Sequence, residues 1–381
     1  MTPSTSETNA WTPVVSDLTG AMLGLPAPGE EREWAEQNFL PVQRELAAWL
    51  HAGTFLQDDM PAPGKTVFLD TDDTPVWFIG DMHGDFLALL LALNLAHTYD
   101  HSLLAHHGGL PLDVPTHLFF LGDFIDEGPH AAETVAWLLA SRAGQTFGGQ
   151  RFSFTALVGN HDEGLAYDEK LRGFWTPVTP SNFFWQLNYS SCPLAIDFGK
   201  AVCSFFRGLP RMALLNNTIM AVHGGIPRAE LTAAIRNMED LESAVALDDY
   251  IWGHLLEDRY EGIPDKRGDS VWIDHCEFDR FIKVFGRIKG AEPRLLLRGH
   301  DHKPRNFKWL ERYRNCRVLT LNNFTVNERG PAVGARYRPV TLARINRPLS
   351  DPLDVHVFQF DLLPSLIEHC RNLPSILENI F

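Results

Sequence analysis

The stretch Gly80-Asp81-Met82-His83-Gly84-Asp85 decides the fold that we expect for this chain. Residues 74–79 before it form an apolar run of strand length and composition, and residues 86–93 after it have a helical pattern. Asp81 and His83 therefore follow the carboxyl end of a strand and face the same opening. A carboxylate and an imidazole together suit a divalent transition metal. Taken alone, the stretch also allows a strand-to-helix turn in which an Asp caps the helix.

The same order of elements recurs four more times, as an apolar strand followed by a motif of Gly and metal-ligand residues. The strands are expected at 116–121, 152–158, 218–222 and 294–297, and their motifs are GDFIDEG (122–128), GNHDE (159–163), HGG (223–225) and GHDH (299–302). Ligands in open α/β sheets bind at the carboxyl ends of strands. Packing alone is a poor explanation for five such units, so we interpret them as one site.

Composition narrows the class of function. The 381 residues are 45% hydrophobic and 21% charged, as in soluble globular proteins, with a formal net charge of −15. This charge argues against a nucleic-acid or anionic-membrane partner, whereas a metal would still allow a phosphorylated substrate. Five scattered cysteines, together with no signal-peptide pattern and no long apolar run, predict a cytoplasmic location.

The order of segments predicts an amino-terminal arm and helix over 1–65 and a single α/β domain over 66–381. Within these, residues 30–55 have a helical pattern, and 68–69 with 76–79 resemble a β-hairpin or a pair of strands. Three alternating segments near the carboxyl end predict a second, half-covered sheet: 317–321, 339–345 and 355–361. The fold class that follows is a sandwich of two mixed sheets flanked by helices.

Two segments offer a functional and a structural interpretation. Residues 97–115 contain four histidines, but no regularly spaced carboxylates accompany them, so we expect a solvated loop. Residues 174–185 are rich in aromatic residues and proline, and could form a lip over a cleft, although buried packing is the favoured interpretation.

The strand-end residues together make the inventory that a two-metal site needs, with a carboxylate able to bridge, imidazoles and a neutral amide. They are Asp81, His83, Asp123, Asn160, His223, His300 and, as an addition, His302. Two cations about 3.5–4 Å apart can activate a water and hold both oxygens of a phosphoryl displacement.

The five motifs, in this order, resemble those of the calcineurin-like metallophosphoesterases, over roughly residues 66–325. Within that superfamily the chain is most similar to the phosphoprotein phosphatase branch. The residues that support this branch are Asp126, the segment 209–227, Ile251-Trp252 and Arg298. The resemblance implies a metallophosphoesterase-type α/β sandwich with two divalent metals, for which manganese is favoured over iron and zinc.

The resemblance also implies roles for individual residues. It assigns a first metal to Asp81, His83 and Asp123, with His302 added from the general superfamily pattern, and a second metal to Asp123, Asn160, His223 and His300. His161, oriented by Asp126, matches the proton donor to the leaving oxygen. A neighbouring carboxylate makes independent sense there, because it raises the pKa of a histidine and fixes its tautomer.

The expected substrate-binding residues, Arg267, Glu127 and Arg298, include a departure from the family. The phosphatase branch usually has Arg where this chain has Glu127, and a second Arg is replaced by Val158. Arg267 matches a further phosphate-binding Arg and would remain as the clamp. A carboxylate in place of a guanidinium removes bidentate phosphate recognition, so the identity of the substrate stays open.

The favoured function is hydrolysis of phosphomonoesters, of phosphoprotein Ser or Thr or of Tyr. An alternative enzyme is a hydrolase of dinucleoside polyphosphates such as diadenosine tetraphosphate. A non-catalytic scaffold is the alternative from another class, and it is disfavoured because no expected metal ligand is missing. The sequence makes no prediction of the oligomeric state.

Overall fold

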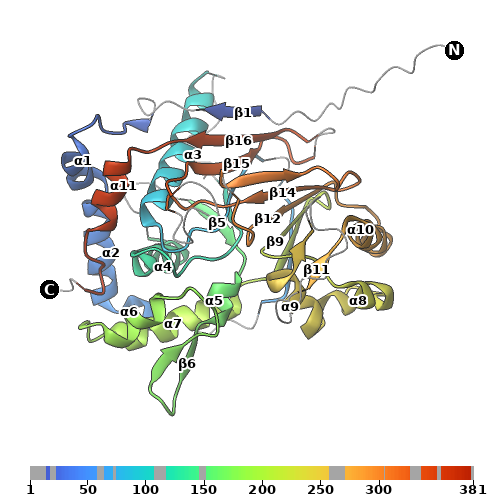
Figure 1. The fold of residues 1–381 in the computed structure, drawn as a ribbon, viewed down its shortest axis with the longest axis horizontal. Coiled ribbons are helices and arrows are strands. Elements are labelled where there is room, and N and C mark those ends of the chain that lie inside the picture. Colours follow the sequence, from blue (N-terminus) through green and yellow to red (C-terminus); the bar gives the residue numbers. More distant parts are fainter. Residues whose placement is uncertain are drawn as a thin grey trace.

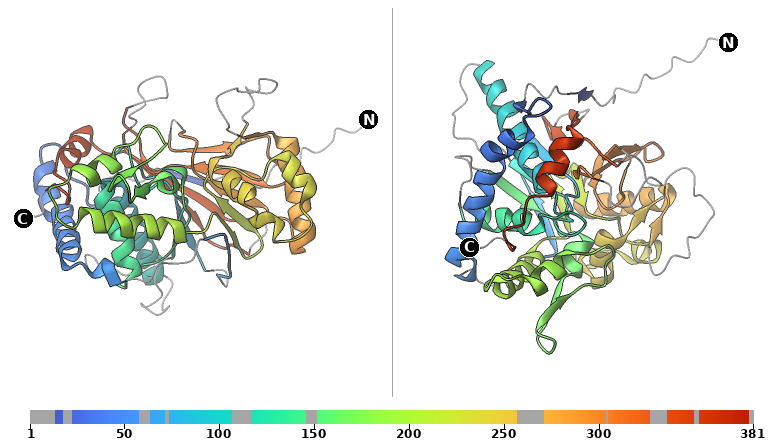
Figure 2. Two further views of the ribbon diagram at one scale, coloured as in Figure 1. Left: turned by 90° about the horizontal axis from the view of Figure 1, so that it is seen from below. Right: turned by 60° about the vertical axis from the view of Figure 1, so that its left-hand side comes forward.

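The structure is a computed structural model of the chain. It describes residues 14–17, 23–57, 64–71, 74–106, 117–145, 152–256, 271–303, 305–326, 336–349 and 353–378, with the backbone alone for 14–17 and 101–106. Two large sheets occupy the middle of the molecule, and helices cover their outer faces (Figures 1 and 2). This arrangement confirms the predicted sandwich.

The first sheet is mixed. Its strand order is β1 (Val14–Asp17), β16 (Val355–Phe360), β15 (Val340–Ile345), β3 (Val76–Ile79), β4 (His117–Phe120) and β5 (Ser153–Ala156). The strands β3, β4 and β5 are parallel, and β15 lies antiparallel between β3 and β16. The carboxyl ends of β3, β4 and β5 therefore meet at one edge, where the first three motifs begin.

The second sheet is also mixed. Its order is β13 (Phe307–Leu310), β14 (Arg317–Leu321), β12 (Leu295–Arg298), β9 (Ile219–Val222), β8 (Met212–Leu215) and β2 (Thr66–Leu69). The parallel neighbours β9 and β12 bring the last two motifs to the same edge. Two short pairs complete the strands: β6 (Ala166–Asp168) with β7 (Gly173–Trp175), and β10 (His254–Leu255) with β11 (Trp272–Ile273).

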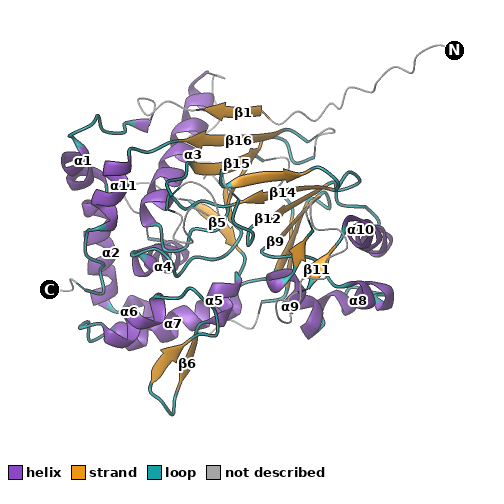
Figure 3. Ribbon diagram, viewed as in Figure 1, coloured by secondary structure: helices purple, strands orange, loops and turns teal. Residues whose placement is uncertain are grey.

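The helices form the outer layers (Figure 3). Those whose apolar residues share a cluster with the first sheet are α1 (Glu31–Asn38), α2 (Leu40–Ala52), α3 (Phe86–His106), α4 (Ala131–Arg142), α6 (Phe183–Tyr189), α7 (Ala195–Gly208) and α11 (Pro364–Arg371). Those that pack on the second sheet are α8 (Ala229–Ala234), α9 (Ala244–Trp252) and α10 (His275–Lys289). The short elements are α5 (Asn160–Gly164), η2 (Thr54–Gln57) and η3 (Asp240–Glu242).

Strand periodicity explains the layering. In β3, Val76 and Phe78 point into the apolar cluster between the sheets, while Trp77 and Ile79 point to the helices. The same alternation holds in β12, where Leu296 packs toward the helices of the second sheet and its neighbours pack inward. Strands that are buried on both faces read as continuous apolar runs, as these do.

Several expectations about local structure need correction. Residues 68–69 and 76–79 do not pair, because β2 pairs with β8 in one sheet and β3 pairs with β4 and β15 in the other. The carboxyl-terminal strands do not form a sheet of their own: β14 joins the second sheet, and β15 and β16 extend the first. These strands are mostly buried on both faces rather than half-covered.

The outcomes for three further segments are mixed. The expected helix over 30–55 is two helices, α1 and α2, whose residues share the core cluster of the first sheet. The histidine-rich segment is helical as far as His106, where a loop was expected, and the rest of that segment lies outside the described residues. In the segment 174–185, Phe174 and Phe183 are buried as expected, whereas Trp175 and Trp185 are about half exposed. Among the described helices, none is long and apolar enough to cross a bilayer.

Candidate metal centre

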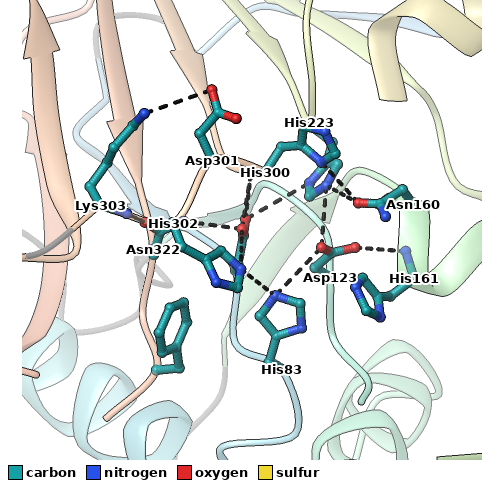
Figure 4. Close-up of polar contacts among 12 residues, drawn as sticks. His83, Asp123, Asn160, His161, His223, His300, Asp301, His302, Lys303 and Asn322 are labelled. Atoms are coloured by element: carbon teal, nitrogen blue, oxygen red, sulfur yellow. Dashed lines mark hydrogen bonds and ion pairs between the residues drawn. The ribbon is translucent and has the colours of Figure 1, made fainter. Parts of the chain in front are cut away.

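The five strand ends place their polar side chains around one point (Figure 4). Asp81 and His83 follow β3, Asp123 follows β4, and Asn160 with His161 opens the short helix after β5. His223 follows β9, and His300 with His302 follows β12. The structure thus brings together all the residues that were expected to hold metal.

The backbone at these ends is strained. Nine non-glycine residues in the described chain have positive φ, and five of them lie in the motifs: His83, Asp123, Asp126, Glu127 and His300. Such conformations cost about 1–3 kcal/mol each, and they persist where the surroundings hold them for function. The backbone at residue 299 also approaches the Asp81 carboxylate closely. Only glycine fits there, since a Cβ at that position would overlap the carboxylate.

One ligand group gathers around His83. Its Nε2 lies 2.9 Å from His302 Nε2 and 3.6 Å from Asp123 Oδ2. His302 Nε2 lies 3.8 Å from Asp81 Oδ2, and the ligand atoms of Asp81, His83 and His302 all lie within 4.8 Å of one another. The converging nitrogen and oxygen atoms match the first metal group expected from the motifs, including His302.

A second ligand group gathers around Asn160. Its Oδ1 lies 3.0 Å from His223 Nε2 and 2.9 Å from His300 Nδ1. His223 Nε2 is also 3.3 Å from Asp123 Oδ2. The Asp123 carboxylate therefore stands between the two groups, which is the position a bridging ligand needs.

Outer contacts orient the ligand side chains. The Nδ1 atoms of His83 and His223 lie 3.2 and 2.9 Å from the carbonyl oxygens of Ile125 and Leu121. A carbonyl oxygen only accepts hydrogen bonds, so these contacts place hydrogen on Nδ1 and leave the Nε2 lone pairs directed into the site. The Asp81 carboxylate accepts from the backbone N–H of His300 at 2.9 Å and from Asn322 Nδ2 at 3.0 Å.

The two interpretations of the first motif apply to different residues. Asp81 belongs to the ligand group, whereas Asp85 caps α3 by accepting from the Ala88 N–H at 3.0 Å. The other oxygen of Asp85 accepts from the Thr325 N–H at 2.7 Å. One hexapeptide thus supplies both a candidate metal ligand and the helix cap.

The electrostatics of the site favour a bound cation. Burial raises the pKa of the Asp81 carboxyl to about 6, because an ionised carboxylate loses its hydration there. Burial alone would lower the pKa of His223, but Asp123 raises it to about 9. The site therefore attracts positive charge at His223 Nε2, and a divalent cation would meet the same demand. The donor set of buried carboxylates, imidazoles and one amide fits divalent metal ions.

His161 and Asp126 form a separate buried pair beside the ligand groups. His161 Nδ1 lies 2.8 Å from Asp126 Oδ2, and the other oxygen of Asp126 accepts from the backbone N–H groups of Asn182 and Phe183. Burial alone would lower the pKa of His161, but the charges of Asp123 and Asp126 raise it. Its backbone N–H also donates to Asp123 Oδ1 at 2.9 Å, which ties the pair to the bridging position.

Comparison with known proteins identifies the family. Residues 74–304 match the family model described as calcineurin-like phosphoesterase. The chain belongs to this family. Its members use divalent metal ions and are hydrolases.

Several solved structures are similar to this chain at low sequence identity. A protein serine/threonine phosphatase from Saccharomyces cerevisiae, with similarity to human phosphatase PP5, is 18% identical with a TM-score of 0.52, covering 89% of this chain and 97% of its own. A cold-active protein-tyrosine phosphatase from a psychrophilic Shewanella species is 14% identical with a TM-score of 0.40, covering 75% and 78%. A protein described as a diadenosine tetraphosphatase is 17% identical with a TM-score of 0.36, covering 79% and 98%.

In this calcineurin-like phosphoesterase a pocket of about 420 Å³ opens over the ligand groups. Its floor, as we define it, consists of Asp123, Asn160, His161, His300 and His302. Its rim consists of Pro177, Val178, Thr179 and Trp252. The rim residues 177–179 come from the aromatic and proline-rich segment, so part of that segment forms the lip that was the disfavoured interpretation.

The three expected substrate-binding residues have different placements. Arg267 lies outside the described residues. Glu127 is partly buried, follows Asp126 directly, and adds its charge to those that raise the pKa of His161. Arg298 is fully buried, and its guanidinium donates to the Gly224 carbonyl and the Asp301 carboxylate, so it supports the pocket wall from behind.

Four residues near the site were missed from the sequence. Asp301 pairs with Arg298 and with His254, and Lys303 lines the pocket with its Nζ 3.7 Å from Asp301. Asp162 accepts from the backbone N–H groups of Asp123, Phe124 and Gly159. Asp162, Asp301 and Lys303 adjoin motif residues, which was the available signal. His254 belongs to no motif, and its role appears only in three dimensions.

Proposed function

We propose that this chain is a metal-dependent phosphatase that hydrolyses phosphomonoesters, of phosphoprotein Ser or Thr or of Tyr, with water activated by two metals. The position of Asp123 is the observation that carries the proposal. Its Oδ2 stands 3.6 Å from His83 Nε2 and 3.3 Å from His223 Nε2. One carboxylate serving two ligand groups is the arrangement that two-metal phosphoester hydrolysis requires.

Two sets of side chains would bind the two metals. Asp81, His83, Asp123 and His302 would hold the first metal, and Asp123, Asn160, His223 and His300 the second. When bound, the cations increase the acidity of a water and offset the charge of phosphate oxygens. We favour manganese, with iron and zinc as the other candidates for these ligands.

His161 would supply the proton for the leaving oxygen. The Asp126 carboxylate accepts a hydrogen bond from Nδ1 of this imidazole. Nε2 is therefore the nitrogen that remains for a substrate in the pocket. A raised pKa keeps the ring protonated nearer to neutral pH, which a general acid needs. Asp126 in turn is anchored by two backbone N–H groups, so the pair is held in one geometry.

Three residues and the pocket rim would act on the substrate side. Arg267 would grip the phosphate, and Glu127 would weaken the binding of a free dianion. Arg298 would act through Asp301 rather than by direct contact, because it is fully buried. The rim offers apolar and aromatic surface to the residues that flank a phosphorylated side chain, with Trp252 36% exposed.

We also propose a cytoplasmic location, supported by five cysteines that form no disulfide. The acidic net charge of −15 opposes nucleic-acid and membrane partners, whereas bound metal would still allow a phosphorylated substrate.

The test is a panel of substrates assayed after reconstitution with Mn²⁺, Fe²⁺ or Zn²⁺. We expect turnover of phosphoserine, phosphothreonine or phosphotyrosine peptides that exceeds turnover of diadenosine tetraphosphate, and none with Asp123→Asn. Preference for the dinucleotide would support the alternative hydrolase. Failure with every substrate and metal would favour the scaffold.

A further inference from the structure

His254 occupies an unusual place beside the second ligand group. It begins the short strand β10, and its backbone N–H donates to the Val271 carbonyl at 2.8 Å. Its ring stacks on Trp272 with centroids 4.3 Å apart and planes at 14°. The ring also lies close to that of His300, with centroids 4.4 Å apart and planes at 39°. The imidazole thus contacts both an indole and a residue of the candidate metal centre.

Three polar distances link His254 to the ligands in series. Asp301 Oδ1 lies 2.8 Å from His254 Nδ1, and His254 Nε2 lies 3.3 Å from His300 Nε2. The far nitrogen of His300, Nδ1, is 2.9 Å from Asn160 Oδ1. The series runs from a carboxylate through two imidazoles to the ligand group.

The chemistry of each atom fixes where the protons lie. An ionised carboxylate only accepts, and Asp301 is ion-paired with the Arg298 guanidinium and lies 3.7 Å from Lys303 Nζ. His254 Nδ1 therefore carries hydrogen, and Nε2 of the neutral ring accepts. Its partner, His300 Nε2, must then donate, which leaves the lone pair of His300 on Nδ1, facing Asn160.

We propose that His254 is a positioning residue that holds His300 in the tautomer whose Nδ1 can bind the second metal. This inference rests on the proposed two-metal site, and it concerns a residue outside the five motifs. Asp301 fixes the tautomer of His254, Trp272 fixes its plane, and Arg298 holds Asp301 in place. A histidine thus takes the place of the carboxylate or carbonyl that usually orients a ligating imidazole.

The opposite arrangement is chemically distinct. If His254 donated from Nε2, His300 Nε2 would accept, and His300 Nδ1 would carry hydrogen toward Asn160 Oδ1. That tautomer has no lone pair for a metal at Nδ1. The position of the proton on His300 therefore decides between the two arrangements.

The first experiment is Mn²⁺ titration by calorimetry of the full-length chain, freed of metal by a chelator. Loss of an outer partner of a ligand typically costs about 10- to 100-fold in metal affinity. We expect His254→Leu to weaken the second of two binding events by that amount and to leave the first unchanged. His254→Gln should restore most of the affinity, because its amide oxygen can accept from His300. His356→Leu, at a histidine paired with Asp354 on β16, is the matched control.

The results separate the inference from the proposed function. Two unchanged binding events in His254→Leu, or equal losses in the Leu and Gln variants, would overturn the positioning role. A wild-type chain that binds a single Mn²⁺ would contradict the two-metal proposal instead.

The second experiment needs no substitution at His254. Nitrogen-15 spectra of the zinc-loaded, full-length chain with labelled histidine report which ring nitrogen of His300 carries hydrogen, with the signal assigned through His300→Gln. We expect hydrogen on Nε2. Hydrogen on Nδ1 would overturn the inference, even if the variants failed to fold.

Discussion

The floor and the rim of the pocket are built in opposite ways. Floor residues such as Asp123, 1% exposed, come from strand ends and are held by backbone contacts from several elements. The rim residue Trp252 is 36% exposed and ends a helix, and residues 177–179 lie in a connection between β7 and α6. The residues proposed for the reaction chemistry thus lie mainly at buried strand ends, while most of those proposed to meet the substrate lie in more exposed segments.

The largest effect is expected at the centre of the floor. Asp123→Asn keeps the shape of the side chain and removes the charge between the two ligand groups. Turnover should fall to background, and metal affinity should fall more than about 100-fold, because even outer partners cost 10- to 100-fold. Metal content by mass spectrometry and steady-state kinetics check this. Asp354→Asn, an exposed carboxylate on the far sheet edge, should leave both unchanged. Full activity with stoichiometric metal would refute the bridging role of Asp123.

The next largest effect should differ between a basic leaving group and a weakly basic one. His161→Asn should slow phosphoserine peptide hydrolysis by about 10²- to 10⁴-fold, because a serine alkoxide needs a proton. Nitrophenyl phosphate should be much less affected, since nitrophenolate leaves almost unaided. The ratio of kcat values for the two substrates measures the difference. Equal losses would mean that His161 only positions or binds.

A smaller effect is a shift in the pH profile. Asp126→Asn retains an oxygen for the Asn182 and Phe183 N–H groups but removes the charge that helps raise the pKa of His161. A lower pKa means that the acid loses its proton at lower pH. The alkaline limb of kcat for a phosphoserine peptide should therefore move to lower pH. An unmoved limb would assign that limb to another group.

The floor could be predicted from the sequence because each strand, glycine and ligand lies within a few consecutive residues. Contacts between distant segments could not. His254 meets Asp301 across 47 positions, and no local pattern marks either residue for the other. The pairing of strands could not be predicted for the same reason: β2 and β3 are adjacent in sequence, yet they belong to different sheets.

The placement of Arg298 shows a related limit. The residue stands directly before a ligand motif, which suggested contact with substrate. Arginine in the last position of β12 instead points into the protein and pairs with Asp301. Alternation along a strand gives the side of the sheet only when the register is known.

The smallest expected effect lies at the substrate side. Glu127→Arg should lower KM for simple phosphomonoesters by about 2- to 5-fold, because partly exposed charge pairs contribute ~1 kcal/mol or less. Glu127→Gln separates loss of repulsion from gain of a donor. Arg267→Ala should raise KM, and less so in the Glu127→Arg background. Additive effects in the double variant would contradict the proposal that both residues hold one phosphate, since the energetic effects of substitutions at such residues are not additive.

The most direct test of the two-metal site is anomalous diffraction at the manganese edge from crystals of the full chain grown with Mn²⁺. We expect two peaks, one on each side of the Asp123 carboxylate, about 3.5–4 Å apart. One peak should contact His83 and His302, and the other Asn160, His223 and His300 Nδ1. A single peak, or peaks away from these side chains, would contradict the two-metal site.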